Sequence, residues 1–138
     1  MNRNITSLIF MMCFSYSLTA YSKDGRISRK VIERSEIPGS NEELQMILIE
    51  YPPGAEAPPH IHPVVGLNYI IDGTAQSQYE GEPLKILRAG DTYQDQANRK
   101  HLVFKNESKT KKLKFLVTCK IRSGHVFTQM LIKEKDPE

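Results

Sequence analysis

Residues 54–73 read GAEAPPHIHPVVGLNYIIDG and hold two of the four histidines of the chain, His60 and His62. Side chains two residues apart lie on the same face of an extended chain, so both imidazoles can point at one ion. Two imidazoles need a third ligand from another strand to hold a divalent metal. His101 begins the β-rich run HLVFK and could supply that nitrogen. The residues alone leave a second interpretation open, in which these are exposed loop histidines without a role.

The rest of the chain consists of short β-rich runs separated by turn residues. Helical periodicity is weak, and the turns carry Gly, Pro, Asp or Asn. About eight short strands at nearly even spacing predict an all-β, single-domain barrel of the jelly-roll type. The predicted strands are Leu44–Tyr51, Leu67–Ile71, Ala75–Tyr79, Leu84–Leu87, Thr92–Asp95, His101–Lys105, Leu113–Ile121 and Val126–Ile132.

Residues 1–22 have the layout of a secretory signal peptide. Arg3 and two asparagines make a short polar start, an apolar run follows, and the small residues Ala20 and Ser22 offer cleavage sites. The apolar run is short for a membrane anchor, and serines interrupt it. We therefore expect an exported protein, periplasmic or secreted, without a stable membrane anchor after signal cleavage.

The predicted barrel spans residues 44–132 and is the only domain expected for a chain of 138 residues. Residues 23–43 are left as an N-terminal lead-in segment or edge strand, and residues 133–138 as a flexible tail. Small barrels often pair through their outer faces or through exchanged edge strands. With residues 26–37 as the candidate exchanged strand, we expect a homodimer.

The charge argues against a nucleic-acid-binding protein, and the cysteine count argues against a disulfide-stabilised one. The chain has 19 Lys and Arg against 16 Asp and Glu, a net charge of +3, and no basic face stands out. Nucleic acid is therefore not an expected partner. Once Cys13 leaves with the signal peptide, Cys119 has no partner for an internal disulfide. Cys119 alternates with apolar residues in KFLVTCKI, so we expect a buried structural thiol.

The spacing of these glycines and histidines resembles the two motifs of the cupin superfamily. The first motif is Gly, five residues, His-x-His, three or four residues, Glu, six residues, Gly. This chain has Gly54, His60-Ile61-His62, Gly66 and Gly73 at that spacing. The second motif is Gly, five residues, Pro-x-Gly, two residues, His, three residues, Asn. Here it reads Gly90, Gln96-Ala97-Asn98, His101 and, one residue late, Asn106. The resemblance spans residues 51 to about 121.

The resemblance implies a small single-domain cupin of the type-2-like kind, with His60, His62 and His101 as ligands of a divalent metal such as Fe, Mn, Zn, Ni or Cu. Gly66 stands where the family has its glutamate ligand, so the fourth position lacks an acid. On this interpretation a glutamate introduced at Gly66 restores a ligand. The alternative is that Gly66 serves the backbone, in a bulge or at a positive φ.

Two further polar residues are candidates to line the cavity. Asn68 lies two residues past Gly66, on the same face of its strand, and Gln94 lies on the strand that precedes the second motif. His125 lies outside both motifs and is expected on the surface. Asn98 takes the place of a turn glycine, which is tolerable because asparagine adopts positive φ more readily than most residues.

Two functions fit these observations, each with a small molecule as ligand or substrate. The first is a metal-dependent oxygenase or isomerase, supported by three histidines inside a barrel wide enough for one small ligand. The second is a non-catalytic module that binds a metal or a small ligand, supported by the loss of the glutamate. A third interpretation keeps the barrel without a metal. No general acid or base stands at a motif position, so the sequence assigns no catalytic residue.

Overall fold

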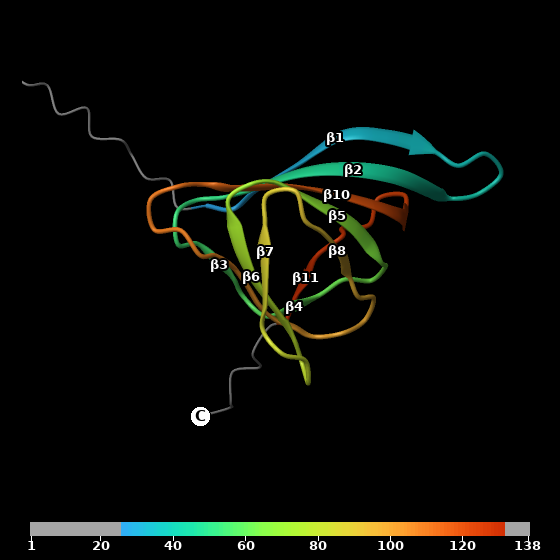
Figure 1. Ribbon diagram of the computed structural model, residues 1–138. Helices are drawn as coiled ribbons and strands as arrows, with labels where there is room; N and C mark the ends of the chain where they lie inside the picture. Colours follow the sequence, from blue (N-terminus) through green and yellow to red (C-terminus); the bar gives the residue numbers. More distant parts are fainter. Residues whose placement is uncertain (1–25, 132–138) are drawn as a thin grey trace, which may run out of the picture.

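The computed structural model describes residues 26–131, which form eleven strands and no helix. The strands make two antiparallel sheets that face each other across one core (Figure 1). The predicted all-β jelly-roll barrel is confirmed. The signal peptide predicted at 1–22 and the tail predicted at 133–138 lie outside the described residues. In the described part of the chain, no helix is long and apolar enough to cross a membrane.

The first sheet has the strand order β1, β2, β10, β5 and β8. Its strands are β1 (Ser28–Glu36), β2 (Glu42–Tyr51), β10 (Leu113–Arg122), β5 (Gly66–Asp72) and β8 (Thr92–Asp95). The side chains of β2 and β10 alternate between buried and more exposed positions, as in strands with one face on a core. Because β10 pairs with both β2 and β5, this sheet joins segments that are far apart in sequence.

The second sheet has the strand order β11, β4, β9, β6 and β7, and β3 pairs with β9 beside it. Its strands are β3 (Glu56–Ala57), β4 (His60–Ile61), β6 (Thr74–Tyr79), β7 (Lys85–Arg88), β9 (His101–Asn106) and β11 (Gln129–Met130). Prolines at 52, 53, 58 and 59 flank the short β3 strand. Since proline cannot donate to a strand ladder, β3 and β4 stay short.

The core between the sheets is built from aliphatic and aromatic side chains. Three rings meet at its centre, those of Tyr51, Phe104 and Phe115, with centroids between 5.1 and 5.8 Å apart. Cys119 is buried in the same core as a free thiol, as its alternation predicted. The strands of the two sheets thus enclose one apolar interior that also borders the histidines.

Two asparagines of the second motif act on the backbone. Asn98 has a φ of 56°, so the substitution for glycine keeps a left-handed turn there. Asn106 is fully buried, and its amide donates to the carbonyl oxygens of Pro52 and Lys111 at 3.0 and 2.8 Å. Asn106 therefore ties the turn before β3 to the turn after β9.

The C-terminal strand differs from the prediction. The sequence indicated a strand over 126–132, whereas within the described residues 126–131 only β11 pairs, with β4. Phe127 turns inward and is 5% exposed, while Val126 beside it is 64% exposed. Burial of the Phe127 ring takes this segment out of the sheet and places it beside the histidines.

The N-terminal strand β1 lies at the edge of the first sheet. It pairs antiparallel with β2 through eight residue pairs, with one irregularity between Val31 and Glu33. Every residue of β1 is exposed. Arg29 faces Ile49, whose side chain points into the barrel, and paired residues of antiparallel strands share a face.

Candidate metal centre

Three histidines that are 41 residues apart at most come together inside the barrel. His60 in β4 and His101 in β9 are direct partners across the sheet. His62 follows β4, and its backbone bridges to Ala97 in the turn of the second motif. One nitrogen from each ring lies within 4.8 Å of the other two, and all three residues are buried. The sequence predicted the same three residues as ligands.

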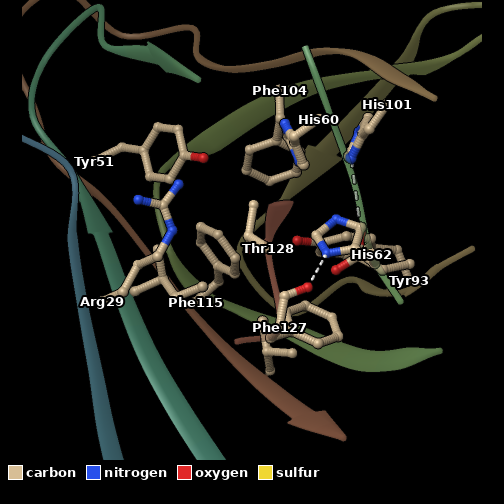
Figure 2. A pocket seen from close by; sticks show the side chains of 13 residues that line it. Arg29, Tyr51, His60, His62, Tyr93, His101, Phe104, Phe115, Phe127 and Thr128 are labelled. Carbon is tan, nitrogen blue, oxygen red and sulfur yellow. Dashed lines mark hydrogen bonds and ion pairs between the residues drawn. The ribbon is translucent and has the colours of Figure 1, made fainter. Parts of the chain in front are cut away.

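In each imidazole, one ring nitrogen is engaged in a hydrogen bond with the protein. Nδ1 of His60 lies 2.8 Å from the carbonyl oxygen of Pro58, and Nδ1 of His62 lies 3.1 Å from that of Phe127 (Figure 2). Nε2 of His101 lies 2.9 Å from the hydroxyl of Ser77. Such contacts fix the orientation of metal-binding histidines and leave the opposite nitrogen free.

Two of the opposite nitrogens lack a hydrogen-bond partner among the described residues. Nε2 of His62 and Nδ1 of His101 are buried and accept or donate no hydrogen bond among the described residues. Buried polar atoms are nearly always paired, because an unpaired one loses its hydration without compensation. A divalent ion between the rings supplies the missing partner, so the three histidines could hold a metal.

Two of the three histidines, His60 and His101, are also in the protonation state that metal binding requires. Burial lowers the pKa of His101 to about 3, with His60 and His62 adding to the effect. Burial is likewise the main reason that the pKa of His60 is lowered. Both rings are therefore neutral at pH 7 and keep a lone pair for an ion.

A buried carboxylate stands beside these nitrogens. Asp95, at the end of β8, is 3% exposed. Its Oδ1 lies 3.6 Å from Nε2 of His62 and 3.8 Å from Nδ1 of His101. The hydroxyl of Tyr79 donates to Oδ1 at 2.9 Å, and the amide of Asn68 donates to Oδ2 at 2.8 Å. The centre thus has an acid although Gly66 lacks one.

Asp95 was not among the site residues predicted from the sequence. The signal was present, because strand alternation in TYQD places residues 93 and 95 on one face and residues 92 and 94 on the other. Gln94, the predicted lining residue, is exposed on the outer face, and the inward positions of β8 belong to Tyr93 and Asp95. The structure therefore corrects the assignment of Gln94 by one residue.

The other predicted polar residues fall into two groups. Asn68 is buried, as expected for an inward position, but it contacts Asp95 and is not part of the cavity wall. His125 is exposed. Asn68 thus holds the carboxylate of Asp95 through its amide and does not line the cavity.

The absence of a side chain at Gly66 leaves room for the aromatic ring of Phe127. Gly66 has no positive φ, and β5 shows no irregularity there, so neither backbone explanation applies. A Cβ at position 66 would lie 2.5 Å from Cζ of Phe127 and 3.2 Å from Cγ1 of Val117. The Phe127 ring stacks on His62 with centroids 4.4 Å apart. The ring fills the space that a glutamate at Gly66 would need, so this variant could add a ligand only if Phe127 moved.

The histidines open onto a narrow cavity with mostly apolar walls (Figure 2). The space open to the centre of a water-sized molecule is about 20 Å³, little more than one bound water needs. The lining comes from both sheets and the C-terminal segment and includes Arg29, Ile49, Tyr51, Tyr93, Phe104, Phe115, Val117, Phe127 and Thr128. A larger ligand can enter only if side chains at this wall move.

Arg29 and Tyr51 stand together at one side of the cavity (Figure 2). Burial raises the pKa of Tyr51 to about 12, and the guanidinium of Arg29 opposes that rise. The charge of Arg29 also contributes to the lowered pKa of His60, so it acts on the metal centre itself. No sequence pattern indicated Arg29 as a cavity residue, because its place depends on the pairing of β1 with β2.

The model of the cupin domain family matches residues 47–119, which include all three histidines and Asp95. No curated protein matches the sequence. Solved structures with a similar fold include a protein of Klebsiella pneumoniae with a double-stranded β-helix domain, at 19% identity and a TM-score of 0.60. That match covers 79% of this chain and 88% of the other.

Two similar structures are enzymes by name. The DMSP lyase DddQ of Ruegeria pomeroyi is 20% identical, with a TM-score of 0.61, over 80% of this chain and 54% of that one. The polyketide cyclase RemF of Streptomyces resistomycificus is 16% identical, with a TM-score of 0.58, over 80% of this chain and 75% of that one. At these identities the likeness shows a shared fold alone.

Proposed function

The chain belongs to the cupin domain family, and from that premise we propose that it is a metal-dependent enzyme that acts on a small anionic molecule. His60, His62 and His101 are the protein ligands of a divalent ion. One observation carries this proposal: two buried histidine nitrogens without a partner converge with a third on one point. The second nitrogen of each ring is engaged elsewhere, so the rings are oriented before any ion arrives.

The donor set fits Fe, Mn, Zn, Ni or Cu, since neutral imidazole suits each of these ions. When bound, such an ion supplies Lewis acidity to an oxygen atom of a ligand. An oxygenase or an isomerase is the reaction class that this arrangement supports. Enzymes built on the same fold, a lyase and a cyclase among them, show that the barrel can host catalysis.

The charges around the cavity favour an anion. Among the residues that line it, Asp95 is the one acid and Arg29 the one permanent cation. The two charges of a divalent ion together with Arg29 outweigh the single carboxylate. Once side chains of the cavity wall move, a small carboxylate could contact both the ion and the guanidinium, where arginine offers two parallel donors. Tyr51 beside Arg29 adds a hydroxyl to the same side of the cavity.

Metal analysis of the purified full chain tests the centre. We expect one divalent ion per chain, and His60→Ala, His62→Ala and His101→Ala should each lose it. His125→Ala is the matched control, because that side chain is exposed and outside the site. Full occupancy in His101→Ala contradicts the proposed ligands, and no ion in any preparation favours a barrel without a metal.

The role of Arg29 is tested with acetate and succinate as probes of the metal-loaded protein. Arg29→Met should weaken binding of either anion by tenfold or more, the loss expected for one charge-assisted contact. Lys30→Met is the control, since Lys30 is the neighbouring exposed cation on the opposite face of β1. Equal anion affinity in the two variants excludes Arg29 from recognition.

A non-catalytic binding module is the second candidate, favoured by the narrow free space beside the histidines. An enzyme needs a coordination position that a ligand can enter, whereas a storage module does not. Azide added to the Co²⁺-loaded protein should change its visible absorption spectrum if the position is open. A spectrum that azide leaves unchanged favours the binding module.

We also propose that the protein is a homodimer. The outer face of the first sheet carries exposed apolar side chains, among them Leu44 on β2 and Leu67, Tyr69 and Ile71 on β5, between 40% and 62% exposed. Burial of this face in a second copy removes it from water. Light scattering at micromolar concentration should give a dimer and Leu67→Glu a monomer. A clean wild-type monomer contradicts the proposal.

Export remains a proposal based on the residue pattern of 1–22. N-terminal sequencing of the native protein should find a start at Tyr21 or Lys23. An intact Met1 contradicts it.

A further inference from the structure

The carboxylate of Asp95 occupies the side of the centre from which the family's glutamate is missing. Gly66 on β5 and Asp95 on β8 are direct partners across the sheet. Side chains of such partners lie on one face with Cβ atoms about 5 Å apart. The acid of this centre therefore lies on β8, the strand next to β5, and reaches the same end of the barrel interior.

The distances from Oδ1 of Asp95 to the histidine nitrogens fit ligands of one ion better than they fit hydrogen bonds. Oδ1 of Asp95 lies 3.6 Å from Nε2 of His62 and 3.8 Å from Nδ1 of His101. These separations are too long for hydrogen bonds. Two donor atoms that each bind one ion at about 2.1 Å can be no more than about 4.2 Å apart. Both histidine nitrogens are buried without a hydrogen-bond partner among the described residues, so Oδ1 and these two nitrogens are close enough to share one ion.

The carboxylate is also held in place from behind. Tyr79 donates to Oδ1 and Asn68 to Oδ2, so the group cannot turn away from the histidines. Oδ1 of Asp95 lies near two histidine nitrogens, and among the described residues no Lys or Arg nitrogen lies within ion-pair distance of the carboxylate. A buried carboxylate without a cation is costly, whereas one beside a divalent ion is balanced.

We propose that Asp95 is a ligand of the metal through Oδ1, which gives a centre of three histidines and one aspartate with the acid on β8. This inference rests on the proposed metal site. The carboxylate lowers the net charge of the centre by one. An oxygen donor beside three imidazoles makes the site better for Mn²⁺ or Fe²⁺ than three imidazoles alone.

Asp95→Asn tests this assignment in the full chain after metal removal, with Mn²⁺ and Co²⁺ as probes. The amide oxygen can still accept from Tyr79, and the unpartnered Oδ1 of Asn68 can turn to meet the new amide. We expect Mn²⁺ affinity to fall by about 100-fold or more, since even partners one shell outside the ligands cost 10 to 100-fold. The visible spectrum of bound Co²⁺ should also change.

Asp72→Asn is the matched control, because Asp72 is an exposed carboxylate on β5. It should leave Mn²⁺ affinity and the Co²⁺ spectrum unchanged. The melting temperature of the metal-free Asp95→Asn protein should stay the same or rise, because an unbalanced buried charge is removed; a marked fall assigns Asp95 to the fold. Wild-type affinity and spectrum in Asp95→Asn, with binding lost in His60→Ala, overturn the inference alone. No binding by the wild type overturns the metal site as well.

Discussion

Replacement of Gly66 by alanine probes the packing that distinguishes this centre. The new Cβ would lie 2.5 Å from Cζ and 3.2 Å from Cε2 of Phe127. Ordinary carbon contacts are about 3.5 to 4 Å, so the ring must move by about 1 Å. Overpacking of this kind costs about 1–3 kcal/mol, and alanine regains about 0.4–1 kcal/mol through the unfolded chain. We expect Gly66→Ala to lower the free energy of unfolding by about 1–2 kcal/mol, or Tm by roughly 5–10 °C.

A double-mutant cycle isolates the contact. Phe127→Leu lacks Cζ and Cε2, the two ring atoms that the new Cβ meets, so Gly66→Ala should cost much less in that background, where the 3.2 Å contact with Cγ1 of Val117 remains. The coupling energy between the two sites is then about 1–2 kcal/mol. Urea unfolding of the four metal-free proteins measures it. Gly66→Glu should likewise lower Tm without a gain in metal affinity while the Phe127 ring is present.

Gly81→Ala is the control for backbone strain. Gly81 has a φ of 80°, and nothing lies within 4 Å of a Cβ built there. Its cost should be the same with Phe127 or its leucine variant. If Gly66→Ala also costs the same in both backgrounds, the ring is not the reason for the glycine, and the reasoning is refuted.

Three further predictions follow from single residues. In the folded protein the pKa of His101 is about 3, against about 6.5 in the unfolded chain. As the pH falls, the unfolded chain therefore binds a proton before the folded protein does. The free energy of unfolding of the metal-free protein should fall by about 2 kcal/mol between pH 6.5 and pH 5. Urea unfolding should show this loss in His125→Ala and a smaller one in His101→Gln. Asn98 has a φ of 56°, so Asn98→Ala should cost about 1 kcal/mol in thermal unfolding and Asn98→Gly less. Burial raises the pKa of Cys119 to about 11, so a thiol reagent at pH 8 should label it only after urea unfolds the protein, and rapid labelling of the native state contradicts this.

Much of the fold was legible in the sequence because its signals are local. Turn residues mark the ends of strands, and alternation in β2 and β10 marks their buried faces. One exception was the segment after β10, where the pattern predicted a strand. Phe127 left the ladder there because its ring is buried against His62 and Gly66, a contact that local pattern does not contain.

The sequence by itself determined the spacing of the histidines, and therefore which side chains could reach a common ion. It also determined that position 66 carries no acid. Only the tertiary structure decided that Asp95 faces the histidines and that Arg29 lines the cavity, because each depends on which strand pairs with which. Register between strands is set by burial of the whole sheet face, and a shift of one residue turns every side chain to the other side. The place of a ligand on a neighbouring strand is thus a property of the folded sheet.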